Sequence, residues 1–283
     1  MGAAIDGVTL ATRWQAPPVP LAAVTASAAA YWRGVIALRR RGRSWSRARS
    51  SSFGAALAVV VVALCSGLAH YDTTVFAAHV MQHLLLAMVA PPLLAMGAPI
   101  TLLLQAGSRA TQRRTLALLH HPFVSALTHP IFTWILFGGS LIALYATGLY
   151  QATLRHPLLH DLVHLHFLMS GALFFWPVVG VDPARWRLPY GARLLYVAIA
   201  VPFHAIVGLT LISTAAPLWP QHTLADQQVG GGVMMLAGDL LTLVIFSIVF
   251  VQWARADDRE ADRYDSQAGD VTSPPWTRSP SAP

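Results

Sequence analysis

The sequence AHVMQHLLLAMVAPPLLAMGAP, residues 78–99, decides how the rest of the chain is interpreted. It is an apolar run long enough to cross a bilayer, which takes about 20 residues of helix. Two histidines, His79 and His83, lie near its start, and the pair Pro91 and Pro92 interrupts its middle. Hydrocarbon penalises a buried imidazole and an interrupted helix unless the rest of the protein supplies partners for them. The stretch therefore predicts a membrane helix that carries a function.

Composition places the whole chain among integral membrane proteins. Of its 283 residues, 55% are hydrophobic and 11% are charged, and the mean hydropathy is +0.53. A soluble domain carries about 25% charged residues. The formal charge of +7 comes from arginines clustered between apolar runs, which is the pattern that sets membrane topology, so no nucleic-acid partner is expected. The single cysteine, Cys65, excludes an internal disulfide and a cysteine-based zinc site.

Seven apolar segments are long enough to span a bilayer as helices, at about residues 17–38, 52–69, 75–96, 130–150, 158–179, 193–214 and 231–253. Residues 100–105 are too few to span and are expected to form an interfacial or re-entrant piece. The predicted fold is an all-α, polytopic membrane helical bundle with about seven transmembrane helices. Its parts are an N-terminal segment, residues 1–16, the transmembrane domain, residues 17–253, and a charged, then Ser- and Pro-rich tail, residues 254–283, which we expect to be disordered.

The arginines predict how the bundle is oriented. Every second connection is basic: the first holds six arginines and the third holds three, whereas Arg13 and Arg155 lie on the other side. Cytoplasmic loops carry an excess of basic residues, so we expect an extracytoplasmic N-terminus and a cytoplasmic tail. A cleavable signal peptide is not expected, because the positive charge follows the first apolar segment instead of preceding it.

Two pairs of histidines are spaced for a shared metal site. His79 and His83 are four residues apart in the third segment, and His160 and His164 repeat that spacing in the fifth. Residues four apart share one helix face, and both segments enter the membrane from the predicted outer side. Imidazole suits copper, zinc, iron and nickel. We therefore predict a metal site in the outer half of the bundle, with His204 of the sixth segment as a further ligand.

Weaker candidates for the same site are His70, His166, Cys65 and Asp239. Thiolate and thioether ligands favour Cu(I), and several sulfur groups lie at a similar predicted depth: Cys65, Met81, Met234 and Met235. Asp239 is an intramembrane carboxylate, which is rare and commonly functional. Each candidate also has a structural explanation, because a polar side chain in a membrane often bonds a neighbouring helix and a lone cysteine packs as a small hydrophobic residue.

The prolines predict distortions of two helices. Pro91 and Pro92 remove two backbone donors and disfavour helix at Ala90, so we expect the third helix to kink or break below the histidines. Such a break would serve either as a gate or as a kink that improves packing. Pro177 is likewise expected to end the fifth helix.

Three strings carry a family resemblance: HVMQHLLLAMVAPPLLAMGAP (79–99), HDLVHLHFLMSGALFFWPVVGVDP (160–183) and PFHAIVGLTLISTAAPL (202–218). Together they resemble the CtaG-type cytochrome c oxidase assembly factors, which are bacterial seven-helix membrane proteins linked to the assembly of caa-type oxidases. The resemblance covers about residues 12–253. It implies a multi-pass protein of the bacterial plasma membrane whose partners are oxidase subunits and the lipid bilayer. It also implies that the protein handles copper for the oxidase.

The predicted function is therefore a non-enzymatic assembly factor that binds or delivers copper through the outer histidines. The sequence holds neither a G-x-S-x-G nucleophile motif nor a GxxxxGK[ST] phosphate loop. Two alternatives remain open. One is a b-type cytochrome, with haem held by histidines from two facing helices. The other is a metal or proton transporter, which a broken third helix and Asp239 would suit.

Overall fold

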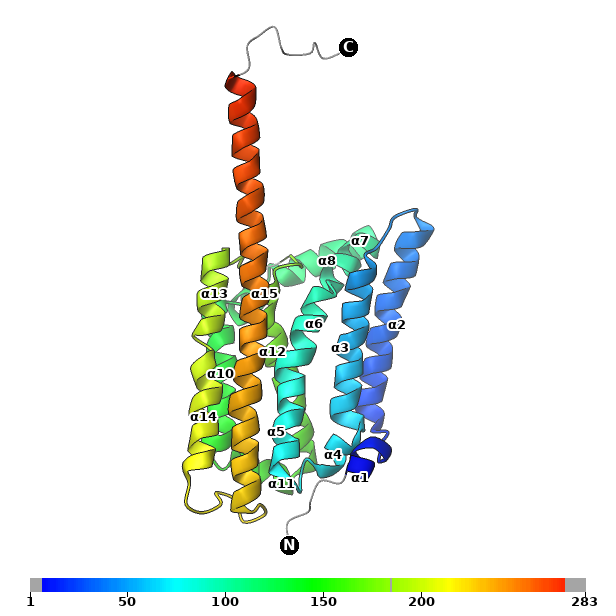
Figure 1. Ribbon diagram of the computed structural model, residues 1–283. Coiled ribbons are helices and arrows are strands. Elements are labelled where there is room, and N and C mark those ends of the chain that lie inside the picture. The colour runs from blue at the N-terminus through cyan, green and yellow to red at the C-terminus, as the bar shows by residue number, and fades with distance from the viewer. Residues whose placement is uncertain (1–6, 184, 273–283) are drawn as a thin grey trace.

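The chain folds as a bundle of long helices. The computed structural model describes residues 7–183 and 185–272, and within those ranges it contains helices and no strand (Figure 1). Six helical stretches are long and apolar enough to cross a membrane. A seventh span results if α10 (Pro130–Ala146) and α11 (Leu149–Arg155), which meet at a bend of 72°, are counted together. The predicted all-α, multi-pass fold is confirmed.

The spans follow the predicted segments closely. In chain order they are α2 (Pro18–Arg40), α3 (Arg47–Cys65) with α4 (Gly67–Tyr71), α5 (Phe76–Leu84) with η1 (Leu85–Val89) and α6 (Ala90–Met96), the α10–α11 pair, α12 (Pro157–Val179), α13 (Tyr190–Ala198) with α14 (Val201–Ser213), and α15 (Leu224–Thr272). Shorter helices complete the described chain: α1 (Gly7–Thr12), α7 (Pro99–Ala106), α8 (Arg109–Leu119) and α9 (Pro122–Leu127).

The two ends of the bundle differ in charge. Figure 1 shows α4, α11 and the start of α15 at one end, here called the α11 end, and α7, α8 and the α2–α3 connection at the other, here called the α8 end. The arginine-rich connections gather at the α8 end, as their alternation along the sequence requires. The positive-inside rule predicts that this end is cytoplasmic. The orientation across the membrane stays a prediction.

Among the described residues, buried side chains form one large core and three smaller clusters. The large core joins α5, η1, α10, α11, α12, α13, α14 and α15. One of the smaller clusters packs the half of α2 nearest the α8 end, where Tyr31 stacks on Phe53 of α3 at 3.9 Å between ring centroids. The Tyr31 hydroxyl donates a hydrogen bond to the Gly97 carbonyl at 2.9 Å. The other half of α2 is mostly exposed at the edge of the bundle.

The helix with the two prolines is continuous from Phe76 to Met96, which corrects the predicted break. Residues Leu85–Val89 form a π-helix, in which the Ala90 N–H donates to the Leu85 carbonyl five residues earlier. Pro91 and Pro92 then lie in the first turn of α6. The N–H groups of a first turn make no hydrogen bond within the α-helix, so the lack of them costs little there. The π-helical turn thus accommodates the two missing N–H groups, and the chain stays helical up to Met96. This finding supports a packing role over a gate.

Two further helix ends differ from the prediction. α12 continues through Pro177 to Val179 and ends at Gly180, which has a φ of 63° and so adopts the left-handed conformation that suits glycine. α15 continues to Thr272, although disorder was predicted from residue 254. Residues 254–272 contain no proline and many good helix formers, which explains the longer helix. The rest of that predicted tail, residues 273–283, lies outside the described residues.

α12 approaches the π-helical turn very closely through Gly171. Neither proline can donate to the Ala87 carbonyl, at α-helical or at π-helical spacing, and this carbonyl faces Gly171. A Cβ at Gly171 would overlap the Ala87 carbonyl oxygen and would lie 2.7 Å from Pro91 Cγ. Only glycine permits this contact, which therefore sets the spacing between α12 and the α5–α6 helix.

We expect Gly171→Ala to destabilise the protein by about 1–3 kcal/mol, because the added methyl group forces α12 away from the π-helical turn. Gly232→Ala on α15 is the matched control, since nothing described lies within 4 Å of a Cβ there. That control should be neutral or stabilising, because alanine is the better helix former. Thermal unfolding of both variants in detergent measures the difference, and equal melting temperatures would contradict this account of the contact.

Candidate metal site

Three imidazoles converge between α5 and α12 in the half of the bundle nearest the α11 end. His79, His160 and His164 each offer a ring nitrogen, and the three nitrogens lie within 4.8 Å of one another. The residues are 0%, 6% and 6% exposed, respectively. Both nitrogens of His79 and the Nε2 atoms of the other two have no hydrogen-bond partner among the described residues. Buried polar atoms in native proteins are almost always paired, so this group of nitrogens calls for a ligand.

Helix geometry explains why these rings meet. His79 and His83 lie on one face of α5 with ring centroids 3.9 Å apart, and His160 and His164 lie on one face of α12 with centroids 4.4 Å apart. Across the helix interface, the rings of His79 and His160 stack at 5.5 Å. The two pairs therefore face each other, as their spacing predicted. We call these four residues the histidine cluster.

His83 is part of the histidine cluster but lies outside the group of three converging nitrogens. Its Nδ1 lies 3.1 Å from the hydroxyl of Tyr145 on α10, within hydrogen-bonding distance. Its Nε2 has no described partner. If the Nδ1–H donates to Tyr145, Nε2 is left with a free lone pair, so Tyr145 can prepare His83 to act as a ligand.

A carboxylate borders the cluster at the α11 end. An oxygen of Asp72, in the turn between α4 and α5, lies 3.9 Å from His160 Nε2. Burial, with a smaller contribution from the nearby Asp161, raises the pKa of the Asp72 carboxyl to about 7. A carboxylate next to a histidine commonly orients the ring and offsets the charge of a bound cation. Asp72 is therefore an acidic group in direct contact with one of the converging histidines.

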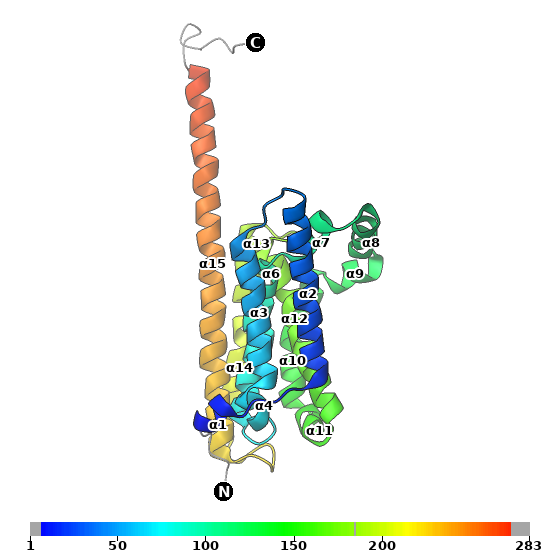
Figure 2. The same ribbon diagram turned by 90° about the vertical axis from the view of Figure 1, so that its right-hand side faces the viewer.

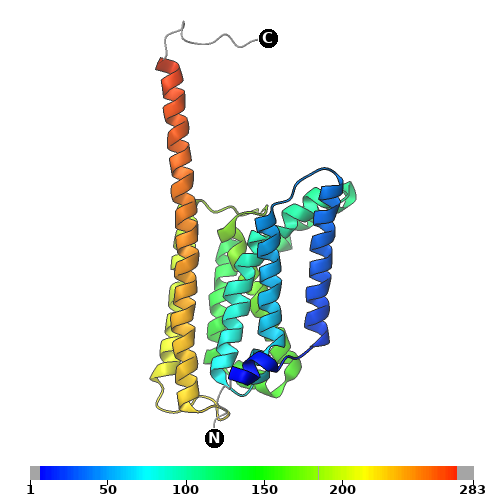
Figure 3. The same cartoon turned by 45° about the vertical axis from the view of Figure 1, so that its right-hand side comes forward.

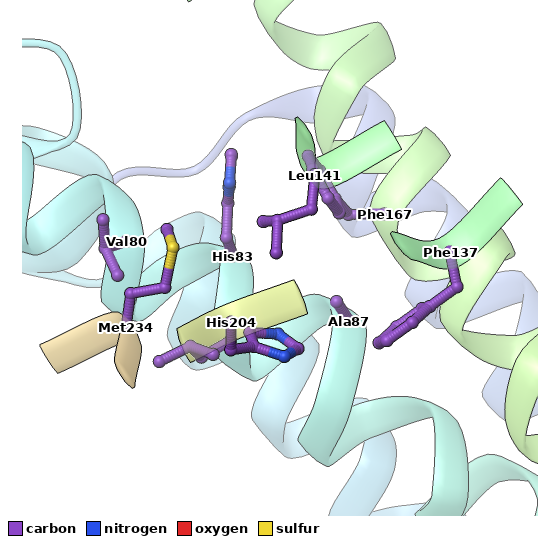
Figure 4. A pocket seen from close by; sticks show the side chains of 9 residues that line it. Val80, His83, Ala87, Phe137, Leu141, Phe167, His204 and Met234 are labelled. Carbon is purple, nitrogen blue, oxygen red and sulfur yellow. The ribbon is translucent and has the colours of Figure 1, made fainter. Parts of the chain in front are cut away.

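His204 lies at a small cavity that His83 also lines. The cavity has a volume of about 20 Å³, enough for a single water molecule. Figure 4 shows His83, His204 and Met234 among the side chains that line it. The Nδ1 atom of His204 has no described partner. His204 thus neighbours the cluster but does not join the three converging nitrogens.

The remaining candidates lie elsewhere. His70 is exposed on α4, and His166 is half-buried on α12 beside Phe167. Cys65 is buried at the end of α3, and Asp239 is half-buried on α15 with one oxygen lacking a described partner. Within the described part of the chain, none of these four joins His79 in a group that could hold a metal ion.

A network that the sequence did not reveal anchors α5. The Tyr150 hydroxyl of α11 lies 2.8 Å from His222 Nε2, and His222 Nδ1 lies 3.4 Å from Asp226 on α15. Asp226 in turn accepts hydrogen bonds from the first N–H groups of α5, from Phe76 at 2.7 Å and from Ala77 at 3.3 Å. The spacing of four residues between His222 and Asp226 could have indicated that these two side chains interact. Nothing in the sequence indicates that Asp226 caps a helix that begins 150 residues earlier.

The comparisons with known proteins settle the family. The family described as cytochrome c oxidase caa3 assembly factor matches residues 29–256. The chain belongs to this family. Membership confirms the resemblance carried by the three strings and, together with the apolar helices, makes the chain a multi-pass protein of the bacterial plasma membrane.

Similar proteins occur in mycobacteria. Uncharacterized proteins of Mycobacterium bovis and Mycobacterium tuberculosis are each 33% identical to the chain over 275 residues, which cover 91% of this chain and 42% of the relative. An uncharacterized protein of Mycobacterium leprae is 33% identical over 256 residues, or 84% of this chain and 39% of the relative. The chain therefore spans less than half the length of these relatives. No solved structure matches it.

We expect Asp226→Ala to loosen the start of α5 and to destabilise the protein by about 1–2 kcal/mol, the usual effect of losing a helix N-cap. Asp239→Ala on the same helix is the control, because Asp239 has no such role in the described structure. Hydrogen exchange at the amides of Phe76 and Ala77 should speed up in the first variant only. Unchanged protection of these amides in Asp226→Ala would show that the carboxylate does not cap α5.

Proposed function

We propose that this assembly factor binds a copper ion through His79, His160 and His164 and passes it to cytochrome c oxidase. The observation that carries the proposal is the convergence of three buried ring nitrogens without hydrogen-bond partners. Copper is the cargo in this proposal, and His83 is a fourth ligand available during uptake or release. The role requires binding and release, and no catalytic residue.

The geometry suits a single small ion. Nitrogen ligands bind such ions at about 2.0–2.1 Å, which places three ligands around one ion about 3.4 Å apart. The three nitrogens already lie within 4.8 Å of one another, so small side-chain rotations would bring them to coordination distance. Two of the ligands are one turn apart on α12 and the third comes from α5, which holds the site from both sides.

The chemistry of the ligand set favours monovalent copper. Imidazole binds copper and zinc alike, but three imidazoles are neutral ligands in a buried site. The cost of burying an ion rises with the square of its charge, so Cu(I) is tolerated there far better than a divalent ion. The membership of an oxidase assembly family fits the same choice of metal.

The alternatives are less well supported. Haem held between two helices needs ring nitrogens that point at each other from opposite sides of the porphyrin. The rings of His79 and His160 instead stack face to face, with their planes 19° apart. A transporter was suggested by a broken third helix and by Asp239. That helix is continuous through its π-helical turn, and Asp239 lies outside the converging group.

We expect purified protein to hold about one copper ion per chain, and His79→Ala and His160→Ala each to lose most of it, because either change leaves fewer than three nitrogens. His166→Ala is the matched control, since His166 lies on the same helix as His160 but outside the converging group. Metal analysis of the four proteins gives the stoichiometry. Equal copper content in all four would overturn the site.

The same variants test the link to the oxidase in cells. In a strain whose own copy is deleted, His160→Ala should leave the oxidase subunits present but the oxidase activity low, whereas His166→Ala should restore activity. Full oxidase activity with His160→Ala would show that oxidase assembly does not depend on the histidine cluster. It would refute the proposed copper delivery.

A further inference from the structure

A large apolar groove opens along one side of the bundle, between α2 and α12. Its volume is about 1030 Å³, and residues of α3, α6 and α7 also line it. Figure 3 shows α2 at the edge of the bundle, and Figure 2 views the bundle from the side on which α2 lies. The groove is therefore a lateral surface that faces lipid or another protein.

The length of the groove matches a transmembrane helix. On α2 its lining runs from Val19 to Ala37, which is a rise of about 27 Å at 1.5 Å per residue. The hydrocarbon core of a bilayer is about 30 Å thick, so a lipid of one leaflet reaches about half as far. One occupant that fills the whole groove must itself span the membrane.

The two walls are shaped for a helix to pack between them. On α2 the groove is lined by Ala23, Ser27 and Ala30, which are exposed, small and spaced by four and three residues. Small residues at such spacing let another helix approach closely in a membrane. On α12 the groove is lined by a stripe of leucines with the same spacing, at 72%, 51% and 54% exposure: Leu158, Leu162 and Leu165. Together the walls offer a seam of small residues opposite a row of large ones.

His164 connects this groove to the histidine cluster. It is 6% exposed, its Nε2 has no described partner, and it lines the groove while its nitrogen belongs to the converging three. A helix in the groove would therefore lie directly beside a metal ligand. The charges on the lining differ along its length, with Asp161 one turn before Leu165 on α12 and Arg33 on the half of α2 nearest the α8 end.

We propose that the groove docks one apolar transmembrane helix of the membrane protein that receives the ion. The docked helix would carry a metal-ligating or basic side chain near Asp161 and His164 and an acidic or polar side chain near Arg33. The identity of the partner as the recipient rests on the proposed function, whereas the docking of a helix does not. Transfer would then take place sideways, within the membrane, through His164.

Photo-crosslinking in native membranes tests the docking. A photo-crosslinking amino acid replaces Ser27 or Ala30, which line the groove, or Ala26 or Ala29, which are exposed on α2 but do not line it. We expect the two groove positions to form adducts with an apolar spanning segment of an oxidase subunit, identified by peptide mapping, in at least about ten-fold higher yield than the two controls. Adducts with lipid alone or with a second copy of this chain, equal yields at all four positions, or no adduct would each overturn the proposal.

A substitution in the groove distinguishes helix docking from copper binding. Ala30→Leu fills the seam and should lower oxidase activity about ten-fold with no change in copper per chain, whereas Ala29→Leu should change neither. If Ala30→Leu also lost copper, or left oxidase activity intact, the groove would not be a docking site. Retention of copper by His160→Ala would refute the proposed function instead, and the crosslinking result would stand apart from it.

Discussion

The contact between Gly171 and the Ala87 carbonyl controls the distance between the two helices that carry the histidines. Pro91 and Pro92 cannot donate to that carbonyl, and the π-helical turn before them leaves it facing α12. Gly171 is the residue that lets α12 come against it. His83 lies one turn before Ala87, and His164 lies two turns before Gly171, so the contact holds the histidine pairs opposite each other. The prolines of this stretch thus help to place the histidines of the same stretch opposite those of α12.

Carboxylates from distant parts of the chain hold both ends of this stretch. Asp226 of α15 accepts hydrogen bonds from the start of α5, and Asp182, which follows α12, accepts them from Ile100 at 3.1 Å and Thr101 at 2.7 Å in the first turn of α7. Free N–H groups at a helix start are costly where water is scarce, and a negative charge there also favours the helix dipole. Side chains far away in the sequence therefore fix where α5, which carries His79, and α7 begin.

The sequence predicted what depends on local pattern. Apolar length gave the spans, arginine spacing gave the alternation of the loops, and the spacing of His79, His83, His160 and His164 gave two pairs that the structure brings together. What it did not give depends on contacts between distant segments. Asp72, Tyr145 and Asp226 look ordinary until the fold places them against the cluster or against α5. The π-helical turn was also missed, because proline chemistry predicts a disturbed helix without saying which of several backbone solutions the packing selects.

The central claim is that three imidazoles hold one Cu(I) ion beside a lateral groove, and X-ray absorption at the copper edge of the loaded protein tests it most directly. The account predicts an edge typical of Cu(I) and about three nitrogen ligands at about 2.0 Å, with imidazole scattering that decreases in His164→Ala. Sulfur ligands at about 2.3 Å, or a spectrum unchanged by His164→Ala, would contradict it.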